Sequence, residues 1–99
     1  MTIPVRLRLR RTKGFNLQAL SRSVNGLPAI NVARPSRWGN PFEVANDASP
    51  EERAQAVERF RRETVPALDL APLGSKNLAC YCRLDQLCHA DILLRVANR

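Results

Sequence analysis

Residues 49–82 read SPEERAQAVERFRRETVPALDLAPLGSKNLACYC, and this stretch decides the fold. Its first four letters are typical of a helix start: Ser caps the first turn, Pro fits the first helical position, and the Glu three residues after the Ser can return to the cap. We therefore predict a helix from Ser49 to about Thr64. Residues 77–82 (NLACYC) then form a short apolar run that predicts a buried strand.

Two more strands are predicted ahead of this helix. Residues 4–11 alternate Arg with apolar side chains, which indicates a strand with one buried face and one wet, cationic face. Residues 16–26 form a polar connection with weak helical character around residues 17–20 (LQAL), and residues 29–33 (AINVA) predict a second strand. Strand, helix and strand joined in this way form a right-handed βαβ unit with parallel strands.

The predicted fold class is therefore α/β. Residues 90–97 (ADILLRVA) predict a C-terminal helix that follows the Cys-rich strand. We expect about three strands in a mostly parallel sheet. A chain of 99 residues is long enough for one modest core and too short for two, so residues 1–99 are predicted to form a single domain.

Composition excludes several classes of protein. A hydrophobic content of 44% is typical of a globular chain rather than a disordered one. No apolar run approaches the roughly 20 residues that span a bilayer. The first residues, MTIPVRLRLR, lack the apolar segment of a signal peptide. We expect a cytoplasmic protein with no membrane partner.

The formal charge of +7 is unevenly distributed. Residues 1–42 carry eight Lys or Arg and no acid, whereas residues 43–99 carry eight against nine Asp or Glu. Fourteen of the sixteen cations are Arg, whose planar fork matches phosphate and carboxylate groups. One interpretation is a nucleotide or nucleic-acid partner, and the other is a solvated basic face without a ligand.

The loop after the second predicted strand, residues 34–42 (RPSRWGNPF), is a candidate binding segment. Ligands of open parallel sheets bind beyond the carboxyl ends of the strands. Arg34 can clamp an anion with two hydrogen bonds. Trp38 can stack on a base or pack into the core, and we favour packing. The candidate ligand-binding residues are Arg34, Ser36, Arg37, Trp38, Asn40 and, from the last helix, Asp91.

The three cysteines, Cys80, Cys82 and Cys88, lie within nine residues, and an odd number does not make a closed disulfide set. Cys80 and Cys82 share one face of the predicted strand, with Cys82 as its last residue. Cys88 lies near a helix N-terminus, where backbone amides and the helix dipole lower the pKa of a thiol. His89, the only histidine, follows directly.

Three interpretations of these residues stay open. In a reactive-thiol site that needs no cofactor, Cys82 or Cys88 is the nucleophile, His89 is the base, and Arg34 holds an anionic substrate. In a zinc site, Cys80, Cys82, Cys88 and His89 are the ligands, although their spacing is unlike common zinc modules and adjacent Cys and His are awkward tetrahedral partners. In the third, the cysteines only pack and the polar residues after them cap the helix.

Three segments resemble one family. They are RRTKGF (10–15), VARPSRWGNPF (32–42) and LACYCRLDQLCHADILLRVAN (78–98), and they are similar to the uncharacterised phage and bacterial family catalogued as domain of unknown function 4326. Tyr81 stands where the family pattern leads us to expect Trp, which keeps an aromatic side chain. The residues that match the pattern are Arg34, Pro35, Trp38, Gly39, Asn40, Pro41, Cys82, Cys88, His89 and Asp91.

Together these features predict a small phage-type accessory protein that binds a phosphate-bearing ligand, a nucleotide or a nucleic-acid end, with or without thiol-based catalysis. The alternative is a zinc-stapled module that binds nucleic acid or a host protein without catalysis. A third hypothesis is an inhibitor of a host enzyme. A shared site requires that Arg34 and the cysteine–histidine cluster face a common crevice.

Overall fold

The computed structural model describes residues 2–34, 36–42, 44–45 and 47–98. Its three parallel strands form one sheet in the order β1-β3-β2, which confirms the predicted α/β class. The strands are β1 (Arg6–Arg8), β2 (Ala29–Asn31) and β3 (Asn77–Cys80). The α-helices of the described residues are α1 (Leu17–Asn25), α2 (Pro50–Arg59) and α3 (His89–Ala97).

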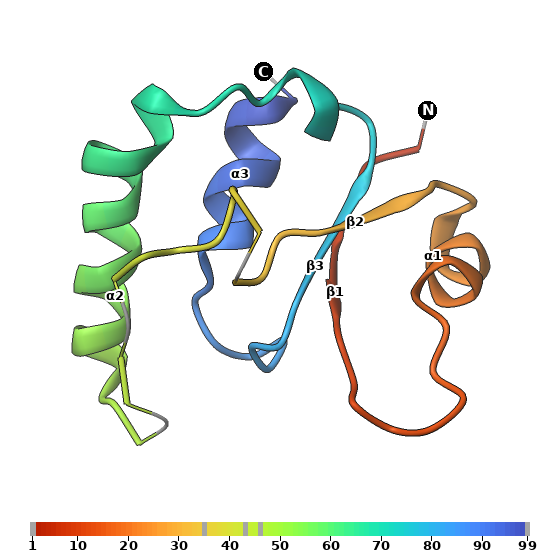
Figure 1. Ribbon diagram of the computed structural model, residues 1–99, viewed down its shortest axis with the longest axis horizontal. Helices are drawn as coiled ribbons and strands as arrows, with labels where there is room; N and C mark the ends of the chain where they lie inside the picture. Colours follow the sequence, from red (N-terminus) through yellow and green to blue (C-terminus); the bar gives the residue numbers. More distant parts are fainter. Residues whose placement is uncertain (1, 35, 43, 46, 99) are drawn as a thin grey trace.

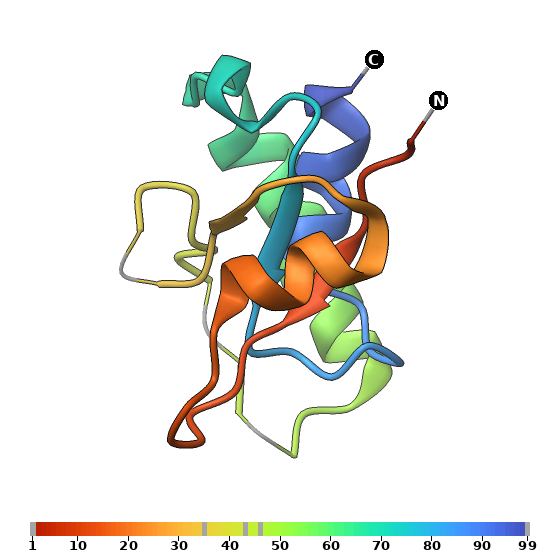
Figure 2. The same ribbon diagram turned by 90° about the vertical axis from the view of Figure 1, so that its right-hand side faces the viewer.

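The crossovers of the chain place the helices on both faces of the sheet. The chain passes from β1 to β2 through α1, across the central strand, and returns from β2 to β3 through α2. Right-handed crossovers in opposite directions put their helices on opposite faces. Figure 1 shows α1 on one side of the sheet and α2 with α3 on the other, and Figure 2 shows α1 in front of the strands. Because the strands are parallel, all three end at the same edge of the sheet.

The α1 helix continues to Asn25, beyond the weak helical signal around residues 17–20. The Asn16 side chain accepts a hydrogen bond from the backbone N–H of Ala19 at 3.0 Å, which caps the first turn. Gly26 ends the helix with a positive φ of 80°, a conformation that glycine adopts without steric cost. Two well-formed caps thus stabilise this helix at both ends.

The strands are shorter than predicted. Regular pairing of β3 ends at Cys80, so the prediction that Cys82 is the last residue of this strand is wrong. Single ladder hydrogen bonds continue beyond the other two strands, from Leu9 N to Cys80 O at 2.8 Å and from Val32 N to Ala79 O at 2.9 Å. The three strands are thus only three, three and four residues long.

The predicted start of α2 is confirmed in detail. Ser49 Oγ accepts from Glu52 N at 3.2 Å, and Glu52 Oε1 accepts from Ser49 N at 3.4 Å. The helix continues as a π-helical turn, η1 (Phe60–Thr64), and a 3₁₀ turn, η2 (Val65–Ala67); another 3₁₀ turn, η3 (Ala71–Leu73), precedes β3. The π-helical turn begins at Phe60, which is fully buried.

Substituting Ser49 by Ala is expected to lower the free energy of unfolding by about 1 kcal/mol, because the cap loses its acceptor. Urea denaturation measures the change. Ser23→Ala is the matched control, since the exposed Ser23 hydroxyl donates to Leu20 O within α1 and does not cap a helix. Equal stability of the two variants would show that the cap contributes nothing.

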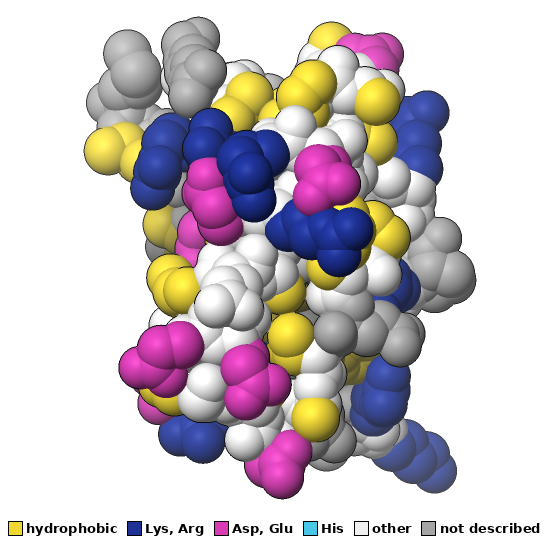
Figure 3. All heavy atoms as spheres, turned by 90° about the vertical axis from the view of Figure 1, so that its left-hand side faces the viewer, with side chains coloured by type: hydrophobic (Ala, Val, Ile, Leu, Met, Phe, Trp, Pro, Cys, Tyr) yellow, Lys and Arg dark blue, Asp and Glu magenta, His cyan; other side chains and the backbone are white. Residues whose placement is uncertain are grey.

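The core lies between the sheet and the helices, and its largest fully buried side chains include Phe60, Leu73, Leu78 and Leu93. The outer face of α2 is polar: acidic and basic side chains alternate over it (Figure 3), among them the pair Arg59–Glu63 at 2.7 Å. In the described part of the chain, no helix combines the length and the apolar character needed to cross a bilayer.

Candidate functional site: an arginine-lined cleft beside three cysteines

A cleft of about 720 Å³ opens beyond the carboxyl ends of the strands. Each strand leads into it: Arg11 follows β1, Arg34 follows β2, and Cys82 follows β3. Cys88 and His89 line the same cleft from the start of α3. Arg34, which follows the edge strand β2, and the cysteine–histidine cluster therefore face one crevice.

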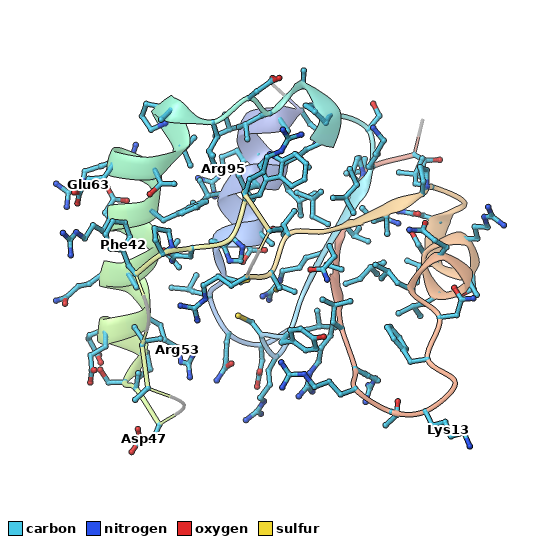
Figure 4. The ribbon with its side chains drawn as sticks, in the orientation of Figure 1. Lys13, Phe42, Asp47, Arg53, Glu63 and Arg95 are labelled. Carbon is cyan, nitrogen blue, oxygen red and sulfur yellow. The ribbon has the colours of Figure 1, made fainter. Side chains whose placement is uncertain are left out.

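Four guanidinium groups line this cleft, those of Arg11, Arg34, Arg53 and Arg83, and the described lining residues include no Asp or Glu. Figure 4 shows Arg53 projecting from α2 toward the interior of the molecule, whereas Glu63 points away from it. Arg53 is half-buried. It shares a helix face, at spacings of three and four residues, with Ala56 and Val57, which also line the cleft.

Arg11 and Arg83 make contacts that a bound ligand can replace or share. The Arg11 guanidinium lies 4.3 Å from the centroid of the Tyr81 ring. Arg83 pairs with Asp85 at 2.9 Å, and both side chains are exposed. An exposed ion pair of this kind contributes little free energy, so an incoming anion can displace the carboxylate at small cost.

Of the six predicted ligand-binding residues, Arg34 and Asn40 line the cleft. Asn40 Nδ2 donates to Ala56 O at 3.3 Å, which ties the loop to α2. Trp38 packs against the core, as favoured, with Nε1 donating to Asp69 O at 3.2 Å and the Arg37 guanidinium over its ring. Ser36, Arg37, Trp38 and Asp91 are not among the lining residues, and Pro35 lies outside the described residues.

The three cysteine sulfurs form a compact cluster, all within 4.8 Å of one another. Cys80 ends β3 and Cys88 is the N-cap of α3; both are buried, with their sulfurs 2.8 Å apart. Cys82 lies in the turn between them and is half-buried at the cleft. Three thiols at these separations can hold a metal ion.

His89 is fixed by two contacts of its ring. Nε2 lies 2.8 Å from Val32 O, and because a carbonyl only accepts, Nε2 carries the proton. Nδ1 therefore has its lone pair available, and it lies 3.5 Å from Cys88 Sγ. Burial has the largest effect on the pKa of His89 and lowers it, whereas the hydrogen bond to Val32 acts to raise it. The net shift is downward, which favours the neutral ring.

Arg6 is the site residue that the sequence analysis missed. The alternation of residues 4–11 placed it on a wet face, but α3 covers that face and its side chain is only 8% exposed. Its Nη2 donates to the carbonyl oxygens of Arg83 at 3.3 Å, Leu84 at 2.9 Å and Gln86 at 2.8 Å. Arg6 thus holds the loop that forms one wall of the cleft.

The Arg6 guanidinium also joins this loop to α3. Its Nε lies 3.3 Å from Asp91 Oδ1, and Asp91 Oδ2 accepts from Cys88 N at 3.3 Å. Burial acts to lower the pKa of Arg6, but the Asp91 carboxylate and the Cys88 sulfur outweigh it, so the net shift is upward. Nη1 is buried and has no hydrogen-bond partner among the described residues.

A family model described as Domain of unknown function (DUF4326) matches residues 9–99. The chain belongs to this family. The comparisons with curated proteins and with solved structures found no match. The DUF4326 region includes every residue found to line the cleft, so the function of this domain has to be argued from the cleft itself.

The pKa values of the three cysteines in this DUF4326 domain shift in different directions. Hydrogen bonds from Cys80 and Cys88, in that order of effect, lower the pKa of Cys82. The hydrogen bond with Cys82 raises the pKa of Cys80, and hydrogen bonds with Cys80 and then Cys82 raise that of Cys88; burial adds to the rise in both. The cluster therefore carries its first negative charge on Cys82, the sulfur that faces the cleft.

Iodoacetamide is expected to alkylate Cys82 in the folded, metal-free protein at a pH well below the ordinary range of a thiol, because its thiolate persists there. Cys80 and Cys88 should stay unmodified until unfolding exposes them. Peptide mass spectrometry reads out each site, with denatured protein as the control. A Cys82 rate that falls with the pH profile of an ordinary thiol would contradict this.

Gly39 is required by the close approach of the loop to Arg34. A Cβ at Gly39 would lie 2.7 Å from Arg34 Cγ and 3.0 Å from Arg34 Cα and N. Gly39→Ala is therefore expected to lower the free energy of unfolding by about 1–3 kcal/mol, as overpacking does. Gly74→Ala is the control, because its Cβ would meet only ordinary contacts at 3.5 and 3.7 Å. Equal urea midpoints for the two would refute the steric argument.

Proposed function

We propose that the cleft binds a phosphate-bearing ligand, either a nucleotide or the phosphorylated end of a nucleic acid. The observation that supports this most strongly is the set of four lining arginines without a carboxylate among the described lining residues. An arginine fork matches the oxygens of a phosphate group, and a concave wall strengthens the attraction by excluding water.

The remaining lining residues suit the organic part of such a ligand. Phe42, Val44, Tyr81 and Leu87 supply apolar and aromatic surface beside the arginines. The volume of about 720 Å³ lies in the range of sites for small molecules. A nucleotide presents both chemistries, an anionic phosphate chain and a flat base, so it fits this lining better than a simple inorganic anion.

The proposal requires no reaction at the cysteines. Binding rests on the guanidinium groups, and Cys82 lies beside the ligand as a potential nucleophile only if a bound group offers it an electrophile. A nucleotide ligand and three unpaired thiols are both consistent with a cytoplasmic protein.

Isothermal titration calorimetry tests the proposal with a graded ligand series. The series comprises inorganic phosphate, nucleoside mono-, di- and triphosphates, the matching nucleosides, and oligonucleotides with and without a 5′ phosphate. We expect the phosphorylated members to bind, with affinity that falls as salt rises. Preference for mononucleotides over phosphorylated oligonucleotides would identify a free nucleotide as the ligand. Equal binding of nucleosides and nucleotides, or no binding at all, would overturn the proposal.

A further inference from the structure

We propose that Cys80, Cys82, Cys88 and Nδ1 of His89 bind one zinc ion at the inner wall of the cleft, joining the end of β3 to the start of α3. This zinc site would stabilise the fold, and it does not depend on the identity of the cleft's ligand.

The three sulfurs lie close enough together to bind one zinc ion. Tetrahedral zinc with Zn–S bonds of about 2.3 Å places its sulfur ligands about 3.8 Å apart. In this protein the three sulfurs lie within 4.8 Å of one another, and the closest two, those of Cys80 and Cys88, are 2.8 Å apart. Small side-chain rotations around one ion bring all three separations to the tetrahedral value.

His89 has the orientation of a metal-ligating histidine. Such histidines donate their second ring N–H to a carboxylate or a backbone carbonyl, which fixes the tautomer. Here Nε2–H donates to Val32 O at 2.8 Å and leaves Nδ1 as the ligand atom. Nδ1 lies 3.5 Å from Cys88 Sγ, about the separation of a nitrogen and a sulfur ligand on tetrahedral zinc.

In the sequence, the adjacency of Cys88 and His89 argued against a zinc site. The structure removes this objection. Cys88 is an extended N-cap residue with φ −144° and ψ 148°, and His89 is the first residue of the helix. This change of backbone conformation leaves Cys88 Sγ and His89 Nδ1 as neighbours. The atoms that lie within 4.8 Å of one another are the three sulfurs, and His89 Nδ1 is not among them. In the zinc-bound protein the imidazole would therefore lie closer to Cys80 and Cys82 than it does here.

The positive charge of Arg6 can balance the net negative charge of such a zinc site. Three thiolates and one Zn²⁺ leave a net charge of −1, which is costly to bury without a cation nearby. The Arg6 guanidinium is almost fully buried, close enough to Cys88 and Cys80 to interact electrostatically with their sulfurs. Its Nη1 has no hydrogen-bond partner among the described residues, so it is available as a donor to a zinc-bound sulfur.

The test is metal binding by the purified 99-residue chain. Elemental analysis is expected to find one zinc per chain, retained during dialysis against a moderate chelator, and stripped protein is expected to bind one Co²⁺ with the visible bands of a tetrahedral thiolate site. Zinc should also raise the thermal midpoint. Folded protein that takes up no metal from excess zinc, or releases it to the chelator at once, would overturn the proposal.

Variants test the individual ligands. Cys82→Ser removes the half-buried sulfur and should keep the fold while binding Co²⁺ more weakly and with less thiolate charge-transfer absorption than the parent. His89→Gln should weaken zinc binding at least about tenfold and shift the Co²⁺ bands toward three sulfurs and a water. Ser23→Ala, at an exposed position of α1, is the control and should bind Co²⁺ as the parent does. A Co²⁺ spectrum that His89→Gln leaves unchanged would refute the imidazole ligand. Nucleotide titrations of stripped and loaded protein separate this test from that of the cleft.

Discussion

Substituting both Arg34 and Arg53 by Ala is expected to weaken binding of the phosphorylated ligand at least about a hundredfold, since each hydrogen bond to a charged group contributes about 1.5–3 kcal/mol. Both side chains line the cleft, one from the loop after β2 and the other from α2. Calorimetry with the best ligand of the series measures the loss.

Two matched controls show whether the loss is specific to the cleft. The double variant Arg22→Ala/Arg95→Ala removes the same charge from exposed positions that do not line the cleft, so its affinity should change little and only at low salt. Arg34→Lys keeps the charge but not the planar fork and should lie between the parent and Arg34→Ala. Equal losses for the Arg34/Arg53 and Arg22/Arg95 pairs would mean that binding depends on net charge and not on this cleft.

The second large effect is expected at Arg6. Arg6→Met should lower the free energy of unfolding by about 3 kcal/mol, because Asp91 loses its buried cationic partner and three loop carbonyls lose their donor. Urea denaturation measures the change. Ligand binding should also weaken, since the loop that carries Arg83 and Gln86 forms part of the cleft wall.

Arg8→Met is the control for Arg6. Arg8 belongs to the same strand and the same alternating set, but it is exposed, so its substitution should change stability by less than about 0.5 kcal/mol. If the two variants unfold at the same urea concentration, Arg6 does not organise the loop and the account of this wall is wrong.

The contrast between Arg6 and Arg8 shows where sequence reasoning fails. Both occupy the same phase of the alternation, and nothing local distinguishes them. The difference arises because α3, more than 80 residues later in the chain, covers the strand at Arg6 and places Asp91 beside it. Burial by a distant element is a tertiary property, so an alternation pattern predicts the faces of a strand but not which face stays in water.

The start of α2 and the position of the cleft could be predicted because the physical causes are local or topological. Ser49 and Glu52 cap the helix through side chains three residues apart. Arg34 and the cysteines meet because parallel strands end at one edge of the sheet. The position of Cys82 was missed because the turn after Cys80 ends the strand early, and Arg53 was missed because its helix face is recognisable only once the cleft is known.

A crystal structure of the protein with a bound nucleoside triphosphate tests the central claim most directly. The account predicts phosphate oxygens within hydrogen-bonding distance of the Arg34 and Arg53 guanidinium groups, beyond the carboxyl end of β3. A nucleotide bound elsewhere on the molecule, with its phosphates away from both arginines, would contradict it.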